Sequence, residues 1–314
     1  MTLPRNKMLG VGLAAVAAVL WLELFAALAP AQMPAVFSGA RAFNDLRDIV
    51  AFGPRPPGSA TLAACRRWII RQLAEDGCQV ERDAFVASTP DGNIKMTNII
   101  GKVPGSSPDV IMLAGHYDTK LFTHFRFVGA NDGGSSTAFL AEMARVLGRH
   151  SHKYTYWLVF FDGEEAIRQG NEMTSTDGTY GSRHLAKELA ADGDLDRVQA
   201  MILVDMIGDK HLDIRLDENS TGWLNKLLFQ TADRLGYSRY FLKNEPDAIG
   251  DDHNPFVAAG VSAVDIIDLD YGPNNSYWHT AQDTIDKCSP QSLQIVGNVV
   301  MAMLQQLNNS PHVH

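Results

Sequence analysis

Residues 154–165 read YTYWLVFFDGEE, and this stretch decides the fold class. Its first eight residues are aromatic, β-branched or aliphatic, which predicts a strand that is buried on both faces. Asp162 and the pair Glu164-Glu165 follow at once. Carboxylates directly after a buried strand cost desolvation energy unless they are paired or bind a cation. Because the carboxyl ends of strands form the ligand crevice of an open α/β sheet, this stretch predicts such a sheet with an acidic site at its edge.

The same pattern, an apolar run followed by a polar residue, occurs once before this strand and once after it in the sequence. Residues 110–114 (VIMLA) precede His116, and residues 201–204 (MILV) precede Asp205. Other candidates stand on predicted loops. The candidate set, in chain order, is His116, Asp132, Glu164, Glu165, Asp205, Asp251, Trp278 and His279. Two imidazoles and five carboxylates at one sheet edge predict a divalent metal site, with zinc as the favoured ion.

Each piece also has a simpler interpretation when it is taken alone. His116 and the carboxylate two residues later are consistent with a hydrogen-bonded surface pair. Asp132 could cap a following helix, since aspartate accepts helix N–H groups, and Asp251-Asp252 could cap a short helix at 254–259. Glu164-Glu165 could belong to a solvated acidic loop. The metal interpretation therefore depends on the whole set.

Helical and extended segments alternate along the chain. The spacing predicts helices over 42–51, 60–76, 135–148, 181–192, 221–236 and 290–307. It predicts strands over 79–87, 95–103, 109–116, 154–161, 200–205 and 262–269. The alternation predicts one α/β domain over residues 32–314, a three-layer α/β/α architecture around a mixed, mostly parallel sheet.

The first 31 residues predict an export signal. Arg5 and Lys7 form a short basic region, residues 8–22 carry no charge, and Ala29-Pro30-Ala31 is a small-residue cleavage pattern. The alternative is an uncleaved membrane anchor, because the apolar stretch continues past Glu23. We therefore expect a periplasmic or secreted protein, or else a membrane-anchored one.

Composition excludes some classes of partner and chemistry. The formal charge of −9 and the lack of Lys/Arg blocks exclude a nucleic acid partner. Cys65, Cys78 and Cys288 make an odd count, and their spacing leaves a Cys65–Cys78 disulfide undecided. None of the three lies beside a histidine, so a catalytic cysteine is not expected. We expect a monomer.

Four further motifs extend the pattern over nearly the whole chain after the signal. They are FGPRPPGS at 52–59, YGSRHL at 180–185, DDHNPF at 251–256 and WHT at 278–280. With these motifs the chain resembles the co-catalytic zinc aminopeptidase superfamily and, within it, the glutaminyl-peptide cyclotransferase branch.

The resemblance implies roles for individual residues. It makes Asp132, Glu165 and His279 the ligands of one zinc and Glu164 the acid/base. Asp205 and Asp251 complete an acidic network, and Trp278 lines the substrate pocket. His116 and Asp205 match the positions that hold a second zinc in the peptidases. The implied reaction converts the N-terminal glutamine of peptides or proteins to pyroglutamate with release of ammonia. The alternative is an aminopeptidase that uses two zinc ions.

The chain also departs from the animal cyclases of this branch. Those enzymes carry a tryptophan shortly after the paired glutamates, where this chain has Gln169-Gly170. They carry a histidine in the last strand, where this chain has Asp265. Loop 270–277 differs as well. We therefore expect the substrate pocket to differ more than the metal centre.

Overall fold

Of the 314 residues, the computed structural model describes 36–168, 174 and 176–309. The predicted signal segment and Gln169-Gly170 lie outside the described residues. Of the helices in the described part of the chain, none combines the length and apolar character that crossing a lipid bilayer requires.

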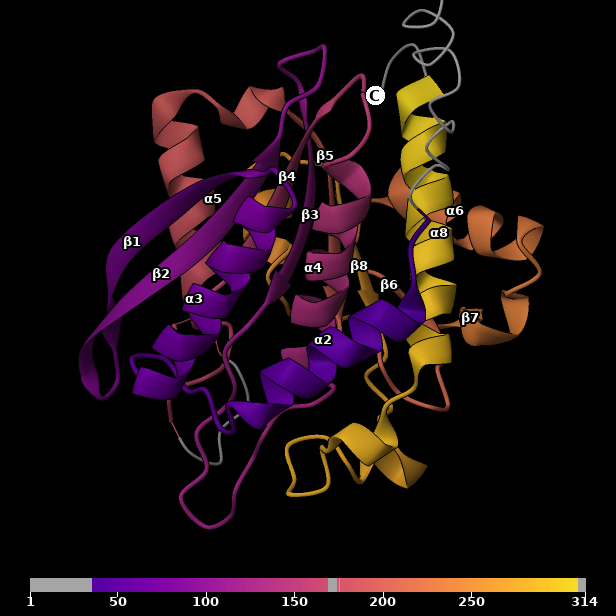
Figure 1. The fold of residues 1–314 in the computed structure, drawn as a ribbon. Helices are drawn as coiled ribbons and strands as arrows, with labels where there is room; N and C mark the ends of the chain where they lie inside the picture. The colour runs from indigo at the N-terminus through magenta and orange to yellow at the C-terminus, as the bar shows by residue number, and fades with distance from the viewer. Residues whose placement is uncertain (1–35, 169–173, 175, 310–314) are drawn as a thin grey trace, which may run out of the picture. The chain divides into compact units, whose positions relative to one another are not determined.

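A six-stranded sheet with the order β1-β2-β4-β3-β5-β8 forms the centre of the fold (Figure 1). Its strands are β1 (Gln79–Thr89), β2 (Gly92–Val103), β3 (Val110–His116), β4 (Thr155–Phe161), β5 (Val198–Asp205) and β8 (Ala263–Ile267). The β1–β2 hairpin is antiparallel and pairs antiparallel with β4, while β4, β3, β5 and β8 run parallel. The predicted mixed, mostly parallel sheet is confirmed.

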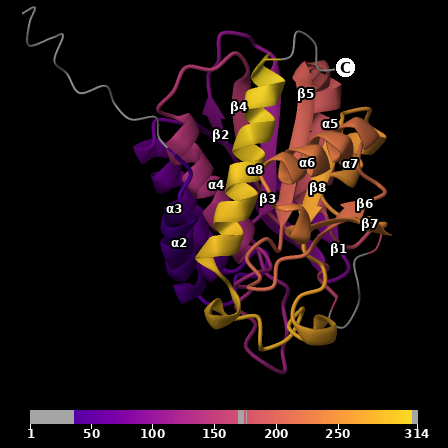
Figure 2. The same ribbon diagram turned by 90° about the vertical axis from the view of Figure 1, so that its right-hand side faces the viewer.

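Alternate residues of the parallel strands pack against helices on opposite faces. On one face, Ile111 and Leu113 belong to the same hydrophobic core as residues of α2 (Gly39–Ala51), α3 (Ala60–Glu75), α4 (Gly134–Leu147), α6 (Gly222–Arg234) and α8 (Pro290–Asn309). On the other face, Val110 and Met112 belong to the core under α5 (Tyr180–Asp192) and α7 (Asn254–Ala258). Figure 2 shows α8, in yellow, between α4 and α6 on the first face. The predicted three-layer architecture is thereby confirmed.

The remaining elements are short. Four are single 3₁₀ turns, η1 (Leu195–Arg197), η2 (Ser238–Tyr240), η3 (Pro273–Asn275) and η4 (Ile285–Lys287). A second, two-stranded parallel sheet pairs β6 (Ile214–Asp217) with β7 (Phe241–Asp247). The sequence did not predict this sheet, because β6 has four residues and β7 is polar and contains a proline. All three cysteines are buried free thiols, and no Cys65–Cys78 disulfide is formed.

Candidate metal centre

Every candidate site residue lies at the carboxyl edge of the parallel strands. His116 and Asp205 end β3 and β5. Glu164-Glu165 follows β4, and Asp132 precedes α4. All of these side chains except His116 line one cleft of about 650 Å³, together with Asp251, Trp278 and His279. The sheet thus brings together residues that are up to 163 positions apart, from His116 to His279.

One donor group consists of Asp132, Glu165 and His279. Nε2 of His279 lies 3.2 Å from Oδ2 of Asp132 and 3.2 Å from Oε1 of Glu165. Ligands at about 2.0–2.1 Å from a tetrahedral zinc ion are separated from one another by roughly 3.3 Å. The donor atoms therefore have the spacing that a tetrahedral metal site requires.

A second donor group shares Asp132 with the first and adds His116 and Asp205. Nε2 of His116 lies 3.3 Å from Oδ1 of Asp132 and 3.2 Å from Oδ1 of Asp205. The two oxygens of Asp132 thus face different groups. The chain retains donors for two neighbouring ions.

The burial of these side chains indicates that a cation belongs among them. Oδ2 of Asp132 and Nδ1 of His116 are buried, and among the described residues neither has a hydrogen-bond partner of good geometry. Five buried carboxylates (Asp132, Glu164, Glu165, Asp205 and Asp251) converge here on two imidazoles and on Lys120, whose Nζ is 3.6 Å from Oε2 of Glu165. Because uncompensated buried charges are costly, this donor set fits a divalent metal.

The crowding of buried charged groups also shifts the pKa values of the side chains in the cleft. Burial raises the pKa of Glu164 well above its ordinary value, and it raises the pKa of Asp251 to about 7. Burial lowers the pKa of His279, but the carboxylates of Glu165 and Asp132 outweigh it and raise that pKa to about 10. Without a metal, the site therefore favours protons as the balancing positive charge.

Asp118 orients residues of both donor groups. Its two carboxylate oxygens accept the backbone N–H groups of Glu164 at 3.2 Å and Glu165 at 3.3 Å. Its Oδ1 also lies 3.5 Å from Nδ1 of His116. Asp118 therefore lies behind His116 and at the same time holds the backbone of Glu164-Glu165.

The backbone of the loop that carries Asp132 is hydrogen-bonded by residues that the sequence analysis did not predict to belong to the site. The buried carboxylate of Asp283 accepts the N–H groups of Asn131 at 2.7 Å and Asp132 at 3.1 Å, and it accepts the hydroxyl of Tyr271 at 3.0 Å. Asp283 comes four residues after His279 and follows no apolar run, so no strand-end signal marked it.

Arg55 supports the same loop from the other side. The side chain is fully buried, and its guanidinium donates to the carbonyls of Val128 at 2.8 Å and Gly129 at 3.1 Å. It also donates to the carbonyl of Tyr117 at 3.3 Å. In the sequence this arginine stands out only as part of the FGPRPPGS motif at 52–59.

Neither of the two alternative helix caps, at Asp132 and at Asp251-Asp252, occurs. The N-cap of α4 is Gly133, at φ 75°, so Asp132 is free to face the metal donors. A Cβ at Gly133 would lie 2.3 Å from the carbonyl oxygen of Asp118, which explains the glycine. The N-cap of α7 is His253, and the carboxylate of Asp252 instead accepts a hydrogen bond from Ser182.

Asp251 leads into a buried polar network behind the cleft. Asp265, at the position noted in the last strand, is fully buried, and its Oδ2 lies 3.8 Å from Nδ1 of His253. Nε2 of His253 is 3.0 Å from Oδ2 of Asp217. Burial raises the pKa of Asp265 well above its ordinary value, and the charge of Asp251 adds to this shift.

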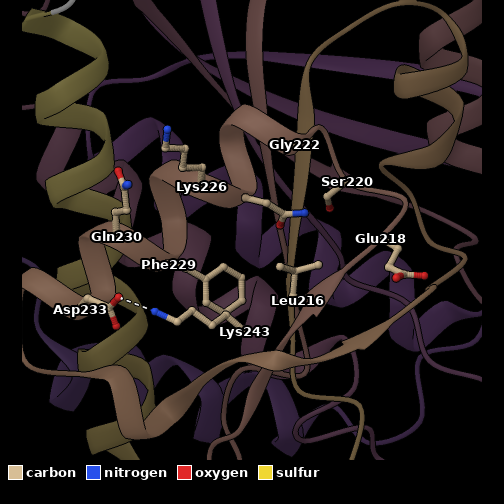
Figure 3. Close-up of a pocket in the computed structure, with 10 residues that line it drawn as sticks. Leu216, Glu218, Ser220, Gly222, Lys226, Phe229, Gln230, Asp233 and Lys243 are labelled. Atoms are coloured by element: carbon tan, nitrogen blue, oxygen red, sulfur yellow. Dashed lines mark hydrogen bonds and ion pairs between the residues drawn. The ribbon is translucent and has the colours of Figure 1, made fainter.

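A second cleft, of about 620 Å³, lies between the β6–β7 sheet and α6 (Figure 3). Phe229 and Leu216 form its apolar part, and Asp233 and Lys243 form an ion pair of 3.1 Å at one side. None of the candidate site residues lines it. The candidate site residues that line one of these two clefts therefore all line the first.

Known proteins share both the fold and the sequence pattern. Residues 98–304 match the model of peptidase family M28. A glutaminyl cyclase from an Acidobacteriales bacterium is 45% identical, with a TM-score of 0.83 over 89% of this chain and 98% of its own. The glutaminyl cyclase of Porphyromonas gingivalis is 31% identical, with a TM-score of 0.78 over 86% of this chain and 99% of its own. The glutaminyl-peptide cyclotransferase of Drosophila melanogaster is 29% identical, over 77% of this chain and 75% of its own.

The family match covers well over half of the chain, and the bacterial cyclases are aligned over nearly their whole length. The predicted resemblance is confirmed. The chain belongs to peptidase family M28 and, within it, to the glutaminyl cyclases.

Proposed function

We propose that this protein is a zinc-dependent glutaminyl-peptide cyclotransferase that converts N-terminal glutamine to pyroglutamate and releases ammonia. One observation carries the proposal. The buried carboxylate of Glu164 stands next to a donor group with metal-site spacing, Asp132, Glu165 and His279, in a cleft walled by Trp278. Membership among the glutaminyl cyclases supports it.

In this proposal Asp132, Glu165 and His279 hold one zinc ion. Two carboxylates and one imidazole leave a fourth position open for substrate, as in other catalytic zinc sites. When bound, the zinc ion supplies Lewis-acid polarisation of the γ-carboxamide carbonyl of the substrate glutamine.

Glu164 moves the protons of the reaction. The neutral α-amine of the substrate attacks its own γ-carboxamide carbon, and Glu164 accepts a proton from that amine. A C–N bond forms in the ring as the C–NH₂ bond breaks, and Glu164 passes the proton to the departing ammonia. Glu164 is buried and adjacent in sequence to the donor Glu165, which suits a group that takes a proton and returns it within the cleft.

The other polar side chains of the cleft assist Glu164, and the aromatic wall holds the substrate. Asp205 and Asp251 are buried carboxylates that line the cleft with Glu164, and the charge of Asp251 raises the pKa of Glu164 further. Trp278 is half-buried in the wall next to His279. Because the nucleophile is tethered, the cleft needs only to hold the substrate in a ring-closing geometry.

An aminopeptidase is the second candidate, and the second donor group favours it. His116, Asp132 and Asp205 could hold a second ion next to the first. Hydrolysis would then use a water molecule in place of the substrate amine, with Glu164 as its base.

The deciding experiment incubates the zinc-supplied protein with a Gln-Phe amide and, separately, with a Leu-Phe amide, and measures product masses. A cyclotransferase removes one ammonia from the glutamine peptide and leaves the leucine peptide intact. Free leucine or free glutamine would overturn the proposal and establish the aminopeptidase.

We also propose that residues 1–31 direct export and are removed, that residues 32–314 form one catalytic domain, and that the mature protein acts on peptide or protein N-termini as a monomer. The basic region, the uncharged run and the Ala29-Pro30-Ala31 pattern support export. N-terminal sequencing of the protein recovered from outside the cytoplasm tests this. A start at Met1 would contradict it.

A further inference from the structure

Metal-binding histidines usually owe their orientation to their second ring nitrogen. That nitrogen donates to a carboxylate, a carbonyl or a water, and loss of this partner weakens metal binding. At His116 a carboxylate lies on that side of the ring, since Oδ1 of Asp118 is 3.5 Å from Nδ1. His279 differs. All interactions of its ring with polar atoms involve Nε2, and no protein group in the described part of the chain hydrogen-bonds its Nδ1.

The imidazole of His279 is enclosed by aromatic rings instead. Trp278 stacks on it, with the ring centroids 4.2 Å apart and an angle of 20° between the planes. Phe122 and Phe127 approach it edge-on, with centroids at 5.7 and 5.9 Å and angles of 67° and 89°. Edge-on and stacked contacts of this kind are favourable beyond the burial of apolar area.

The two phenylalanines also support each other. Their rings meet edge-on at 5.3 Å, and Phe122 stacks on Phe125 at 4.5 Å. Phe127 is fully buried, and Phe122 is half-buried. The pair therefore forms a fixed surface against which the imidazole of His279 rests.

His279 needs such a support because its backbone does not hold it in a relaxed conformation. Its φ of 52° is left-handed, which is unfavourable for a residue with a Cβ atom. It also stands at the end of a loop in which Asn274 and Asn275 have positive φ angles. Side-chain packing must therefore hold the ring where its Nε2 meets Asp132 and Glu165.

We propose that Phe122 and Phe127 are positioning residues for His279, and that they take the role which a hydrogen bond to the second imidazole nitrogen has in other metal sites. The inference rests on the zinc ligands of the proposed function. It assigns a task to loop 120–128, which also places Lys120 beside Glu165. This one loop then contacts two of the three zinc ligands and leads directly into the segment that carries the third.

The test measures zinc affinity without any peptide substrate. Metal-free full-length protein competes for Zn²⁺ with a chromophoric chelator of known affinity. We expect Phe122→Ala and Phe127→Leu each to weaken zinc binding by about tenfold, the effect of losing the group that orients a ligand. Phe85→Ala is the matched control, because Phe85 stacks on His184 at 4.3 Å in a pair outside the metal site. It should bind zinc like the unaltered protein.

A double substitution separates positioning from general loosening of the fold. In a His279→Ala background, Phe122→Ala should weaken zinc binding no further, because the ring it positions is gone. Equal losses in both backgrounds, or wild-type affinity in both phenylalanine variants, would overturn the inference. Unchanged affinity in His279→Ala alone would instead refute the zinc site of the proposed function. Because no turnover is measured, these results hold whichever reaction the protein catalyses.

Discussion

The adjacent glutamates Glu164 and Glu165 give the sharpest test of the proposed mechanism. Both are buried, and both follow the same strand. Only Glu165 belongs to a metal donor group. The Glu164→Gln and Glu165→Gln variants are matched in size and charge, so any difference between them reports on role alone.

The structure sets the size of the expected effects. Glu164 is the residue we assign to both proton transfers, and each positioned acid or base contributes about 10²–10⁴-fold. We therefore expect Glu164→Gln to lower kcat by roughly 10³–10⁴-fold, which is about 4–5.5 kcal/mol of barrier at 1.36 kcal/mol per decade. Its zinc affinity should remain, since the donor atoms of Asp132, Glu165 and His279 are untouched.

Glu165→Gln should behave in the opposite way. It replaces one of three ligands by a neutral amide 3.2 Å from Nε2 of His279. The loss of zinc affinity should exceed the roughly 100-fold that follows when only an orienting group is removed. The loss of turnover should be partly restored by excess zinc.

Metal analysis after dialysis, chelator competition and ammonia release measured on a Gln-Phe amide check both variants. Retained turnover in Glu164→Gln would refute the acid/base role. Loss of zinc from Glu164→Gln together with retention in Glu165→Gln would show that the two roles are assigned the wrong way round.

Three further results are expected. Asp283→Asn places an amide NH₂ group against a backbone N–H of the Asp132 loop and so removes a charge-assisted hydrogen bond of about 1.5–3 kcal/mol. This loss should lower the Tm of the zinc-loaded protein by roughly 3–10 °C. An unchanged melting curve would contradict this expectation. Burial raises the pKa of Asp45 from 3.8 to about 7 in the folded protein. As pH rises from 3.8 to about 7, this carboxyl therefore ionises in the unfolded chain while it stays protonated in the folded one, and the folded state loses stability. Asp45→Asn should therefore gain stability over the unaltered protein at pH 8 and none at pH 3, measured by urea unfolding; an equal gain at both would refute the assignment. His116→Ala should keep one zinc per chain by metal analysis, and loss of that ion would argue for coupled sites.

The candidate site was largely predictable because its main residues follow strands that the sequence marks clearly. Glu164-Glu165 and Asp205 come directly after buried apolar runs, and the topology of a parallel sheet brings such positions together. For Asp132 the sequence does not distinguish a helix cap from a metal ligand, because both place an aspartate just before a helix. Only the positive φ of Gly133 and the resulting loop path decide between them.

The supporting residues were not predictable because their function arises only in three dimensions. Asp283 and Arg55 carry no periodic or strand-end signal, yet both hydrogen-bond the backbone of the Asp132 loop. The orientation of His279 likewise depends on aromatic rings more than 150 positions away in the sequence. The β6–β7 sheet was missed for a different reason, as its strands are too short and too polar to show an apolar pattern.

Arg55 has a consequence for how the metal centre matures. The segment that matches the family model begins at residue 98, whereas the guanidinium that holds the carbonyls of Val128 and Gly129 comes from a turn between the first two described helices. Asp283 reaches the same loop from just before the last helix. The loop is thus held by two segments far apart in the sequence, so the backbone around Asp132 reaches its final position only when both segments are in place. A fragment limited to residues 98–304, the part that matches the family model, would lack Arg55 and its hydrogen bonds to this loop.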